Sequence, residues 1–361
     1  MPRDLDTHDP SRRDFLGYCL GAAVAVGAAT FSGSAQAAFA ANDMDWRSFK
    51  DRFMAPDGRI IDTGNNGISH SEGQSYGMLF AVTFGDRQSF DLIHGWTVRN
   101  LTRKTDALHV WRYLPDSKNH SPDQNNATDG DLVIAFALSR AARIWQEPQY
   151  AAAAIAIASD IRRSLIVNAG SKIVLLPALT GFTHKTSVTV NLSYYNFVAF
   201  RELSVIDPSP LWQLLELDGL SLIQAARFGK WQLPPDWLSV GISSGTASIA
   251  AGWPPLSSFD AIRVPLNLTW AAALPADTLA SFTGYWTSAA AYQPAWANLK
   301  TDQVSPYAAP SGLVAIKAVT LAGSPQMGLP ALPSVNDAKD YYSAALTLLA
   351  RIAWTDSHGT G

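Results

Sequence analysis

The sequence predicts an all-α fold in which helices pair into a ring or barrel. Apolar residues recur at helical spacing in about a dozen segments spread over the 361-residue chain. These segments do not alternate with strands as in an α/β fold, and no Gly/Ser-rich linker separates them. No unit repeats at a fixed period, which argues against an open solenoid. We therefore expect one large helical domain with a closed arrangement.

The helical segments are recognised by their apolar faces and by the breaks between them. In the first, Trp46, Phe49 and Phe53 share one face, and in the third Phe90 and Ile93 do the same. Pro, Gly, Asn and Asp clusters separate almost all of them. The helices expected are 45–54, one that starts at residue 71, 86–101, 129–145, 149–167, 193–205, 210–227, 259–273, 276–290, 311–321 and 336–353. The best strand candidates are 172–176 and 187–190.

Three connections between the helices are long and rich in Trp, Pro and Gly: 106–127, 228–258 and 291–310. Binding sites are usually built from such loops on a rigid scaffold. The chain has 12 Trp, which either fill a core or form stacking platforms for flat ligands such as sugar rings or bases. Because the formal net charge of −3 leaves no basic excess, we expect sugars rather than nucleic acid as partners.

The N-terminal segment has the pattern of a secretory signal. A twin-arginine motif at 11–16 is followed by an uncharged run at 17–31 and the small-residue site Ala35-Gln36-Ala37. The alternative is a single membrane anchor, but the run is short, rich in Ala and Gly, and ends at a cleavage-like site. We predict a cleavable signal at 1–37, a single domain at 38–361, export to the periplasm or medium, and no membrane span after cleavage. The only cysteine, Cys19, falls within the signal.

Several kinds of chemistry lack sequence support. Histidines such as His70, His109, His120 and His184 are scattered without metal-ligand spacing, so no metal site is expected. No Gly-rich phosphate loop follows a strand, and no Gly-x-Ser-x-Gly elbow occurs. The sequence therefore indicates neither a cofactor nor a serine nucleophile.

Glu72 lies at the start of a predicted helix, among glycines and hydroxyl side chains. Ser71 and Gln74 have capping-box spacing, so we expect Glu72 in the first helical turn. A carboxylate there either stabilises the helix dipole or acts as a catalytic acid. The sequence pattern alone leaves both possibilities open.

Two further groups of acids begin helices beside aromatic loops. Asp129 and Asp131 precede an apolar run, with Thr128 or Asp129 as the expected N-cap. One acid can be explained by capping, but two exceed what capping requires. Asp260 and Arg263 are three residues apart at another helix start, and form either a surface ion pair or part of a cleft. If these helix ends converge, two carboxylates could flank a glycosidic bond as acid and base.

Three blocks resemble the signatures of glycoside hydrolase family 8. They are Ser71-Glu-Gly-Gln-Ser-Tyr-Gly77, Ala127-Thr-Asp-Gly-Asp-Leu132 continuing to Trp145, and Ser258-Phe-Asp-Ala-Ile-Arg-Val264. The similarity covers essentially the whole mature chain and includes Asn191-Leu-Ser-Tyr-Tyr195, Gly229-Lys-Trp-Gln-Leu-Pro-Pro-Asp-Trp237 and Tyr341-Tyr-Ser-Ala-Ala-Leu-Thr-Leu348. The chain is most similar to the endoglucanases that accompany bacterial cellulose synthesis.

The resemblance implies an (α/α)6 barrel and inverting hydrolysis of β-1,4-glucan. It implies that Glu72 is the general acid, Asp260 the general base, and Asp129 a sugar-binding residue that helps to place the water. Family signatures have also labelled Asp129 a nucleophile, which an inverting enzyme does not need. The implied substrate-binding residues are Asp131, Arg263, Trp111, Tyr194, Tyr195 and Trp237.

The implied mechanism carries two expectations about the carboxyl groups. An inverting pair lies ~6.5–9.5 Å apart, and we expect this for Glu72 and Asp260, whereas roughly 5 Å would indicate retention. A general acid must also carry its proton near neutral pH, although a helix N-terminus favours the charged form.

Two alternatives to a β-1,4-glucanase remain at this stage. One is another activity on the same scaffold, on xylan, chitosan or mixed-linkage glucan. The other is a non-catalytic glucan-binding partner of a cellulose synthase complex. A pure binder has no need of the acid–base pair, so the presence of Glu72, Asp129 and Asp260 argues against the second. Functional association of the enzyme with cellulose synthase is an expectation of the resemblance.

Overall fold

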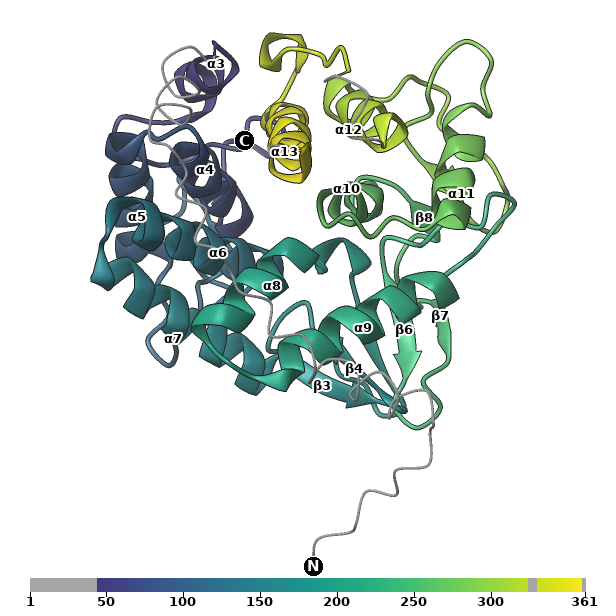
Figure 1. Cartoon of the computed structure of the whole chain (residues 1–361), viewed down its shortest axis with the longest axis horizontal. Coiled ribbons are helices and arrows are strands. Elements are labelled where there is room, and N and C mark those ends of the chain that lie inside the picture. The colour runs from purple at the N-terminus through teal and green to yellow at the C-terminus, as the bar shows by residue number, and fades with distance from the viewer. Residues whose placement is uncertain (1–43, 324–329, 359–361) are drawn as a thin grey trace, which may run out of the picture.

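The computed structural model describes residues 44–323 and 330–358 (Figure 1). Within them, six helices form an inner ring: α4 (Ser71–Thr83), α6 (Thr128–Trp145), α8 (Phe197–Ile206), α10 (Arg263–Trp270), α12 (Ser311–Ala322) and α13 (Tyr341–His358). Each packs against the next, and α13 packs against α4, which closes the ring. The prediction of a closed all-α barrel, and of the (α/α)6 type, is confirmed.

Outer helices cover the ring from outside. They are α3 (Met44–Phe53), α5 (Arg87–Leu101), α7 (Pro148–Ser164), α9 (Pro210–Ala225) and α11 (Ala276–Trp286). The outer α5 is amphipathic and buries Phe90, Ile93, Trp96 and Leu101 at helical spacing. The inner α4 is instead buried on every side from Gly73 to Val82, because neighbours surround it. The two helices differ as expected for an outer and a central position in the ring.

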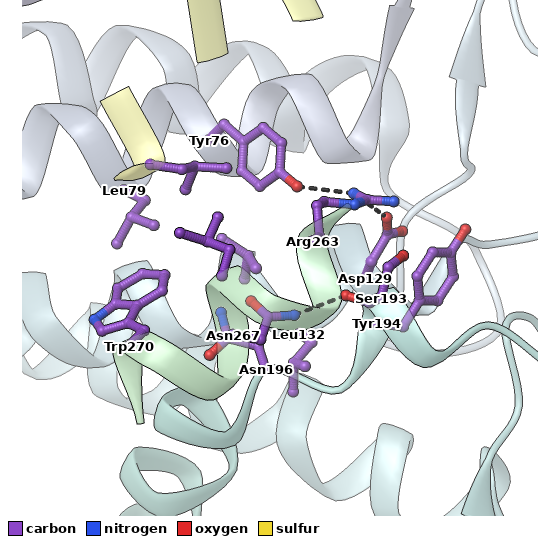
Figure 2. Close-up of a pocket in the computed structure, with 13 residues that line it drawn as sticks. Tyr76, Leu79, Asp129, Leu132, Ser193, Tyr194, Asn196, Arg263, Asn267 and Trp270 are labelled. Atoms are coloured by element: carbon purple, nitrogen blue, oxygen red, sulfur yellow. Dashed lines mark hydrogen bonds and ion pairs between the residues drawn. The ribbon is translucent and has the colours of Figure 1, made fainter. Parts of the chain in front are cut away.

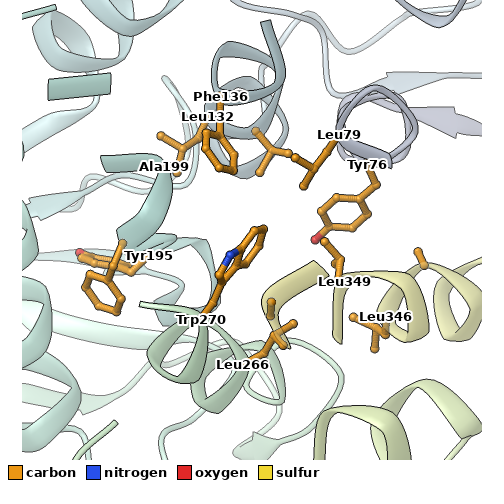
Figure 3. Packing of buried hydrophobic residues seen from close by; sticks show 14 of the residues in the cluster. Tyr76, Leu79, Leu132, Phe136, Tyr195, Ala199, Leu266, Trp270, Leu346 and Leu349 are labelled. Atoms are coloured by element: carbon orange, nitrogen blue, oxygen red, sulfur yellow. The ribbon is translucent and has the colours of Figure 1, made fainter. Parts of the chain in front are cut away.

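The inner helices enclose a continuous apolar core. Figure 3 shows Trp270 of α10 between Leu132 and Phe136 of α6, Leu79 of α4 and Leu349 of α13. Trp270 is 4% exposed and the other four are at most 3% exposed. This packing fixes the inner helices relative to one another, and therefore also fixes the loops at their N-terminal ends.

Short antiparallel strands lie in the connections. β1 (Ser69–His70) pairs with β2 (Arg112–Tyr113), β3 (Ile166–Ala169) with β4 (Lys172–Leu175), and β8 (Leu256–Ser257) with β9 (Ala297–Asn298). The three-stranded sheet has the order β5 (Ser187–Val190), β6 (Leu238–Gly241), β7 (Ala247–Ile249). Both predicted strands are present, as β4 and β5. The other strands lie in segments with too few alternating residues to be recognised from sequence.

Several predicted helix starts were too early. Residues 192–194 form a short 3₁₀ turn, and α8 begins only after Asn196, whose side chain accepts the Ala199 N–H. The segment from 259 makes a turn before α10 begins at Arg263. Similarly, a 3₁₀ turn at Val335–Asp337 precedes α13. In each case a short turn precedes the helix, so the helix starts later than the apolar spacing suggested.

Both capping predictions are wrong. The N-cap of α4 is His70, whose Nδ1 accepts the Gly73 N–H at 2.9 Å. Gln74 is buried and its Oε1 instead accepts the Ile60 N–H at 2.6 Å. The N-cap of α6 is Ala127, without a side-chain cap, so Thr128 and Asp129 are already helical. Asp129 is therefore free to point out of the helix end.

The first and last described helices are joined by polar contacts. Asp45 of α3 accepts hydrogen bonds from Ser334 Oγ and Val335 N, both 2.9 Å, and pairs with Arg351 of α13 at 2.6 Å. Arg52 of α3 donates to the carbonyls of Val335 and Ala338, both at 2.6 Å. These contacts, named here the α3–α13 clasp, hold the ring closed from outside.

The predicted signal at 1–37 lies outside the described residues. Among the described helices, none has the length and apolar character needed to cross a membrane. That residues 38–361 form a single domain stays a prediction.

Candidate active site

The N-terminal ends of α4, α6 and α10 meet on one side of the ring. The closest approach is at Gly130 of α6, where a Cβ atom would lie 2.4 Å from Ser71 Oγ and 2.8 Å from Glu72 N. Glycine is required there because the backbones of α4 and α6 pass so near to each other. This contact brings Glu72 and Asp129 together, as the sequence analysis required.

Arg263, the first residue of α10, joins all three predicted catalytic acids. Its Nη1 lies 2.5 Å from Glu72 Oε2 and 3.4 Å from Asp129 Oδ2, while Nη2 lies 2.8 Å from Asp260 Oδ1. Nη1 also donates to the Tyr76 hydroxyl at 2.9 Å (Figure 2). Residues far apart in the sequence therefore form one cluster around a single guanidinium.

Exposure differs among the side chains of this cluster. The Arg263 side chain is 5% exposed and that of Asp129 is 9%, whereas Glu72 is 18% and Asp260 31% exposed. The alternative of a surface pair between Asp260 and Arg263 is therefore wrong. The two proposed acid–base residues are the more accessible members, and the guanidinium lies beneath them.

Two acids of the cluster, Asp129 and Asp260, have raised pKa values. Burial, reinforced by the charge of Glu72, raises the pKa of Asp129 to about 7, although Arg263 opposes the shift. Burial and the Glu72 charge also raise the pKa of Asp260, again against Arg263. The pKa of Tyr76 is raised by burial, so its hydroxyl keeps its proton. The cluster can therefore hold a proton near neutral pH, as acid–base catalysis needs.

Asp236 is a functional candidate that the sequence analysis missed. Its Oδ1 accepts the N–H groups of Ser258 and Ala261, at 2.8 and 2.9 Å, on both sides of Asp260. Burial and the Asp260 charge raise the pKa of Asp236 to about 7. Its position in the Pro-Pro-Asp-Trp block was visible, but nothing in the sequence linked it to residue 260. It holds the turn that presents the Asp260 carboxylate.

Tyr76 was also missed, although its spacing contained a signal. It follows Glu72 by one helical turn, so both side chains leave α4 on the same face. Tyr76 is 5% exposed, and its hydroxyl contacts Arg263 rather than solvent.

Aromatic side chains lead outward from the cluster. The Tyr194 ring lies 5.8 Å from Arg263 Cζ and makes an edge contact with Trp237 at 6.5 Å. Trp237 stacks with Phe182 at 5.6 Å and with Trp253 at 4.1 Å and 18°. Trp253 is 40% exposed and was not predicted, whereas one face of the predicted Trp237 is covered by it.

The backbone of Trp111 is hydrogen-bonded to the start of α4. Its carbonyl accepts the Ser71 N–H at 3.1 Å, and its indole Nε1 donates to Asp123 at 2.7 Å. The guanidinium of Arg112 lies 4.4 Å from its ring. Its proposed contact with sugar stays a prediction.

Two predicted substrate-binding residues are in fact structural. The Tyr195 side chain is fully buried among apolar residues (Figure 3), and its hydroxyl accepts the Leu175 N–H at 2.9 Å. Asp131 is also fully buried, and it accepts hydrogen bonds from His109 N at 2.8 Å and Asn126 Nδ2 at 3.0 Å. Neither side chain can reach a ligand in the cleft. Asp131 anchors the long 106–127 connection to α6.

A cavity of about 220 Å³ lies beside the cluster. It is lined by Asp62, Phe259, Asp340 and Tyr342, among others. The Tyr342 ring lies 6.0 Å from Arg263 Cζ, and its hydroxyl donates to the Phe259 carbonyl at 2.6 Å. Aromatic rings and carboxylates with space between them are suited to bind a polyhydroxylated ligand. Among the described residues, no group of three or more His, Cys, Asp or Glu has metal-binding geometry.

The comparisons with known proteins agree with this site. The family model described as Glycosyl hydrolases family 8 matches residues 19–356. A probable endoglucanase from Novacetimonas hansenii is 47% identical over 309 residues, 85% of this chain and 89% of that protein. An endoglucanase from Cellulomonas uda is 40% identical over 277 residues, covering 76% and 77% of the two chains.

The solved structures include the endo-β-1,4-glucanase CMCax from Acetobacter xylinum. It is 44% identical, with a TM-score of 0.82 over 89% of this chain and 99% of that one. The fold, the convergence of the acids and the match along the chain all point the same way, and the chain is a glycoside hydrolase that belongs to family 8.

Proposed function

We propose that this protein is an endo-β-1,4-glucanase that cleaves its substrate with inversion. The observation that carries the proposal is the Arg263 guanidinium, which contacts Glu72 through one nitrogen and Asp260 through the other. Hydrolysis of a glycosidic bond by acid–base catalysis requires two carboxyl groups held on one scaffold, and inversion requires that they lie ~6.5–9.5 Å apart. The names of the similar proteins support the choice of β-1,4-glucan.

In the proposed reaction Glu72 gives its proton to the leaving glycosidic oxygen. Asp260 takes a proton from the water molecule whose oxygen attacks the anomeric carbon from the opposite face. Asp129, whose pKa of about 7 lets it share a proton with its neighbours, binds the sugar at the cleavage point. Arg263 fixes the positions of the three acids relative to one another through its contacts with them. After each turnover Glu72 has lost a proton and Asp260 has gained one. Exchange of protons with solvent restores both residues to their starting states.

The aromatic residues give the proposed site its length. Tyr194, Trp237 and Trp253 form a connected series that starts beside Arg263. Sugar rings stack on exposed aromatic faces, so we propose that a glucan chain follows this series on one side of the cleavage point.

The test is the anomeric form of the products from defined cello-oligosaccharides, followed by NMR. Inversion predicts that the first product formed is the α-anomer. Glu72→Gln should reduce kcat by more than about 100-fold while keeping affinity for cello-oligosaccharides. Glu216→Gln, which alters a surface ion pair with Arg201, is the matched control and should leave kcat unchanged.

Retention of the β-anomer would overturn the assignment of Asp260 as base. Faster release of sugar from xylan or chitosan than from carboxymethylcellulose would overturn the assignment of β-1,4-glucan as the substrate. Retained hydrolysis by Glu72→Gln would remove Glu72 from the mechanism.

We also propose that the enzyme is exported by the twin-arginine route to the periplasm or medium and acts beside a cellulose synthase. The motif at residues 11–16 and the resemblance to enzymes of cellulose synthesis support this. Replacing Arg12 and Arg13 with Lys should retain the chain in the cytoplasm. Failure of the enzyme to alter newly made cellulose in a producing strain would contradict the association.

A further inference from the structure

His70 links a loop to the helix that carries Glu72. Its Nδ1 accepts the Gly73 N–H at 2.9 Å, and its Nε2 lies 3.2 Å from Asp62 Oδ2. The imidazole is 13% exposed and touches the Tyr341 ring edge-on at 5.6 Å. Glu72 lies between His70 and Gly73 in the sequence, so this cap closes the turn that positions the proposed proton donor.

The two contacts specify where the imidazole carries its proton. A ring nitrogen that accepts an N–H hydrogen bond cannot itself be protonated. Nδ1 is therefore bare, and Nε2 carries the hydrogen that is donated to Asp62. The cap requires the neutral ring in this one tautomer, and a second proton on Nδ1 would face the Gly73 N–H and break the cap.

The ring has little room to avoid this conflict. A Cβ atom at Gly73 would lie 3.3 Å from His70 Cε1 and 3.3 Å from the Tyr341 hydroxyl. Asp62 is itself held, because its Oδ1 accepts the Gly64 N–H at 3.0 Å and its backbone N–H donates to the Ile68 carbonyl at 2.8 Å. His70 is thus clamped between a fixed loop, the start of α4 and α13.

Charged groups face His70 from most of the elements around it. The surrounding loop contributes Asp62, α4 contributes Glu72 and α6 contributes Asp129, while α13 contributes only the uncharged Tyr341. On the paired strand β2, the guanidinium of Arg112 turns over the Trp111 ring. Burial opposes the charged ring, but the Asp62 bond and the Glu72 charge outweigh it and raise the pKa of His70. Protonation therefore competes with the cap as the pH falls.

We propose that His70 is a positioning residue for Glu72, which it holds through a cap that only its neutral Nε2–H tautomer can make. Acidification breaks this cap and loosens the turn that carries Glu72. The inference rests on the proposed function for its effect on glucan hydrolysis, but the cap itself is independent of that function.

Two amide substitutions, each of which can approximate the position of one ring nitrogen, separate the two ends of the ring. Asn places an oxygen near the position of Nδ1 and is a strong N-cap, whereas Gln reaches towards Asp62 but leaves Gly73 uncapped. His70→Asn should keep kcat within about threefold of the parent, and His70→Gln should lower kcat roughly 10- to 100-fold with little change in KM. In the parent enzyme, protonation of His70 should contribute to the fall of kcat at low pH. The His70→Asn variant should lack this contribution, because Asn does not titrate.

Equal losses in both variants, or none in His70→Gln, would overturn the positioning role. A second measurement needs no activity: ¹⁵N NMR of histidine-labelled enzyme, with amide exchange at Gly73 as a function of pH. We expect the Nε2–H tautomer at pH 8 and a Gly73 amide that loses protection as His70 takes its second proton. The inference is overturned if the ring is the Nδ1–H tautomer, or if the exchange protection of the Gly73 amide does not change as His70 titrates. If the enzyme does not hydrolyse glucan but the NMR result is as expected, only the proposed function is overturned.

Discussion

Arg263 is the residue through which the carboxylates of the site are connected. A planar guanidinium can contact acids through two separate nitrogens, whereas a lysine ammonium presents all its donors from one point. This difference explains why the position carries Arg: one buried cation contacts Glu72, Asp129 and Asp260 together.

Arg263→Lys tests this role. Lysine keeps the charge but cannot contact Glu72 and Asp260 at once, so we expect kcat to fall about 100-fold or more. Steady-state kinetics on cello-oligosaccharides measure the change. Arg227→Lys, at a surface pair with Asp277, is the control and should behave as the parent. Equal activity of the two variants would show that bridging is dispensable.

Asp129→Asn tests the electrostatic state of the cluster. In the folded protein the pKa of Asp129 is about 7, above the value of about 3.9 for an unfolded chain. The folded state thus binds more protons than the unfolded state between these values, and the stability contributed by Asp129 is lost as pH rises through 7. At pH 8 the charged carboxylate destabilises the fold.

We therefore expect Asp129→Asn to raise the free energy of unfolding at pH 8 by at least about 1 kcal/mol, while activity falls. The gain should shrink towards pH 4, where the parent carboxyl is protonated. Urea unfolding at both pH values provides the measurement, and a gain that is constant with pH would contradict the raised pKa.

At the scale of elements, the site depends on how closely α4 and α6 approach each other. Gly130→Ala would place a methyl group 2.7 Å from Ser71 C and 2.8 Å from Glu72 N, both backbone atoms. The helices must then separate, which should cost about 1–3 kcal/mol of stability and lower kcat at least tenfold. Gly284→Ala, in the exposed part of α11 with its nearest neighbour 3.7 Å away, should be neutral or stabilising. Thermal unfolding and kcat measured on both variants decide between these outcomes.

The connection between β7 and β8 supplies the exposed end of the aromatic series. Removing the Trp253 ring should weaken stacking of long chains and leave the buried cluster intact. We expect Trp253→Ala to raise KM for long cello-oligosaccharides about 2- to 10-fold and to change kcat little. Leu217→Ala, an exposed apolar residue of α9, is the control. If long and short substrates lose affinity equally, Trp253 does not belong to the glucan path.

The sequence predicted helices well and their caps badly. The apolar spacing of Phe90, Ile93, Trp96 and Leu101 directly reports the buried face of α5, so that helix could be located to within a residue. At the start of α4 the same polar residues can cap, pack or catalyse, and local pattern alone chose Ser71 and Gln74 wrongly. Tertiary contacts decided, because Gln74 is required inside to bond Ile60.

The site residues divide in the same way. Glu72, Asp129 and Asp260 were identified by motif, and the structure brings them together. Asp131 and Tyr195 share those motifs but face the interior, which no spacing rule reveals. Motifs preserve the residues that support a site as well as those that could touch the substrate.

At the scale of the whole molecule, the α3–α13 clasp ties the first described helix to the segment that closes the ring. Asp45→Ala would remove one acceptor shared by Ser334 and the buried Val335 N–H, and the partner of Arg351. We expect a loss of about 2–4 kcal/mol in the free energy of unfolding. Urea denaturation measures it, with Asp51→Ala, at an exposed position of the same helix, as the control. A loss no larger than that of the control would show that apolar packing alone closes the ring.

The clasp also has a consequence for the order of events during synthesis. Arg52 finds its acceptors 283 and 286 residues further along the chain, and Asp45 its partners at separations of 289 and 290. While the ribosome is still making the earlier helices, Phe80 and Phe84 can already cover one part of the apolar face of α3, but the part that contacts Tyr341 has no partner yet. Closure therefore waits until α13 has been made. A nascent chain stalled before residue 335 should remain sensitive to protease at α3, and the released chain should become resistant in one late step.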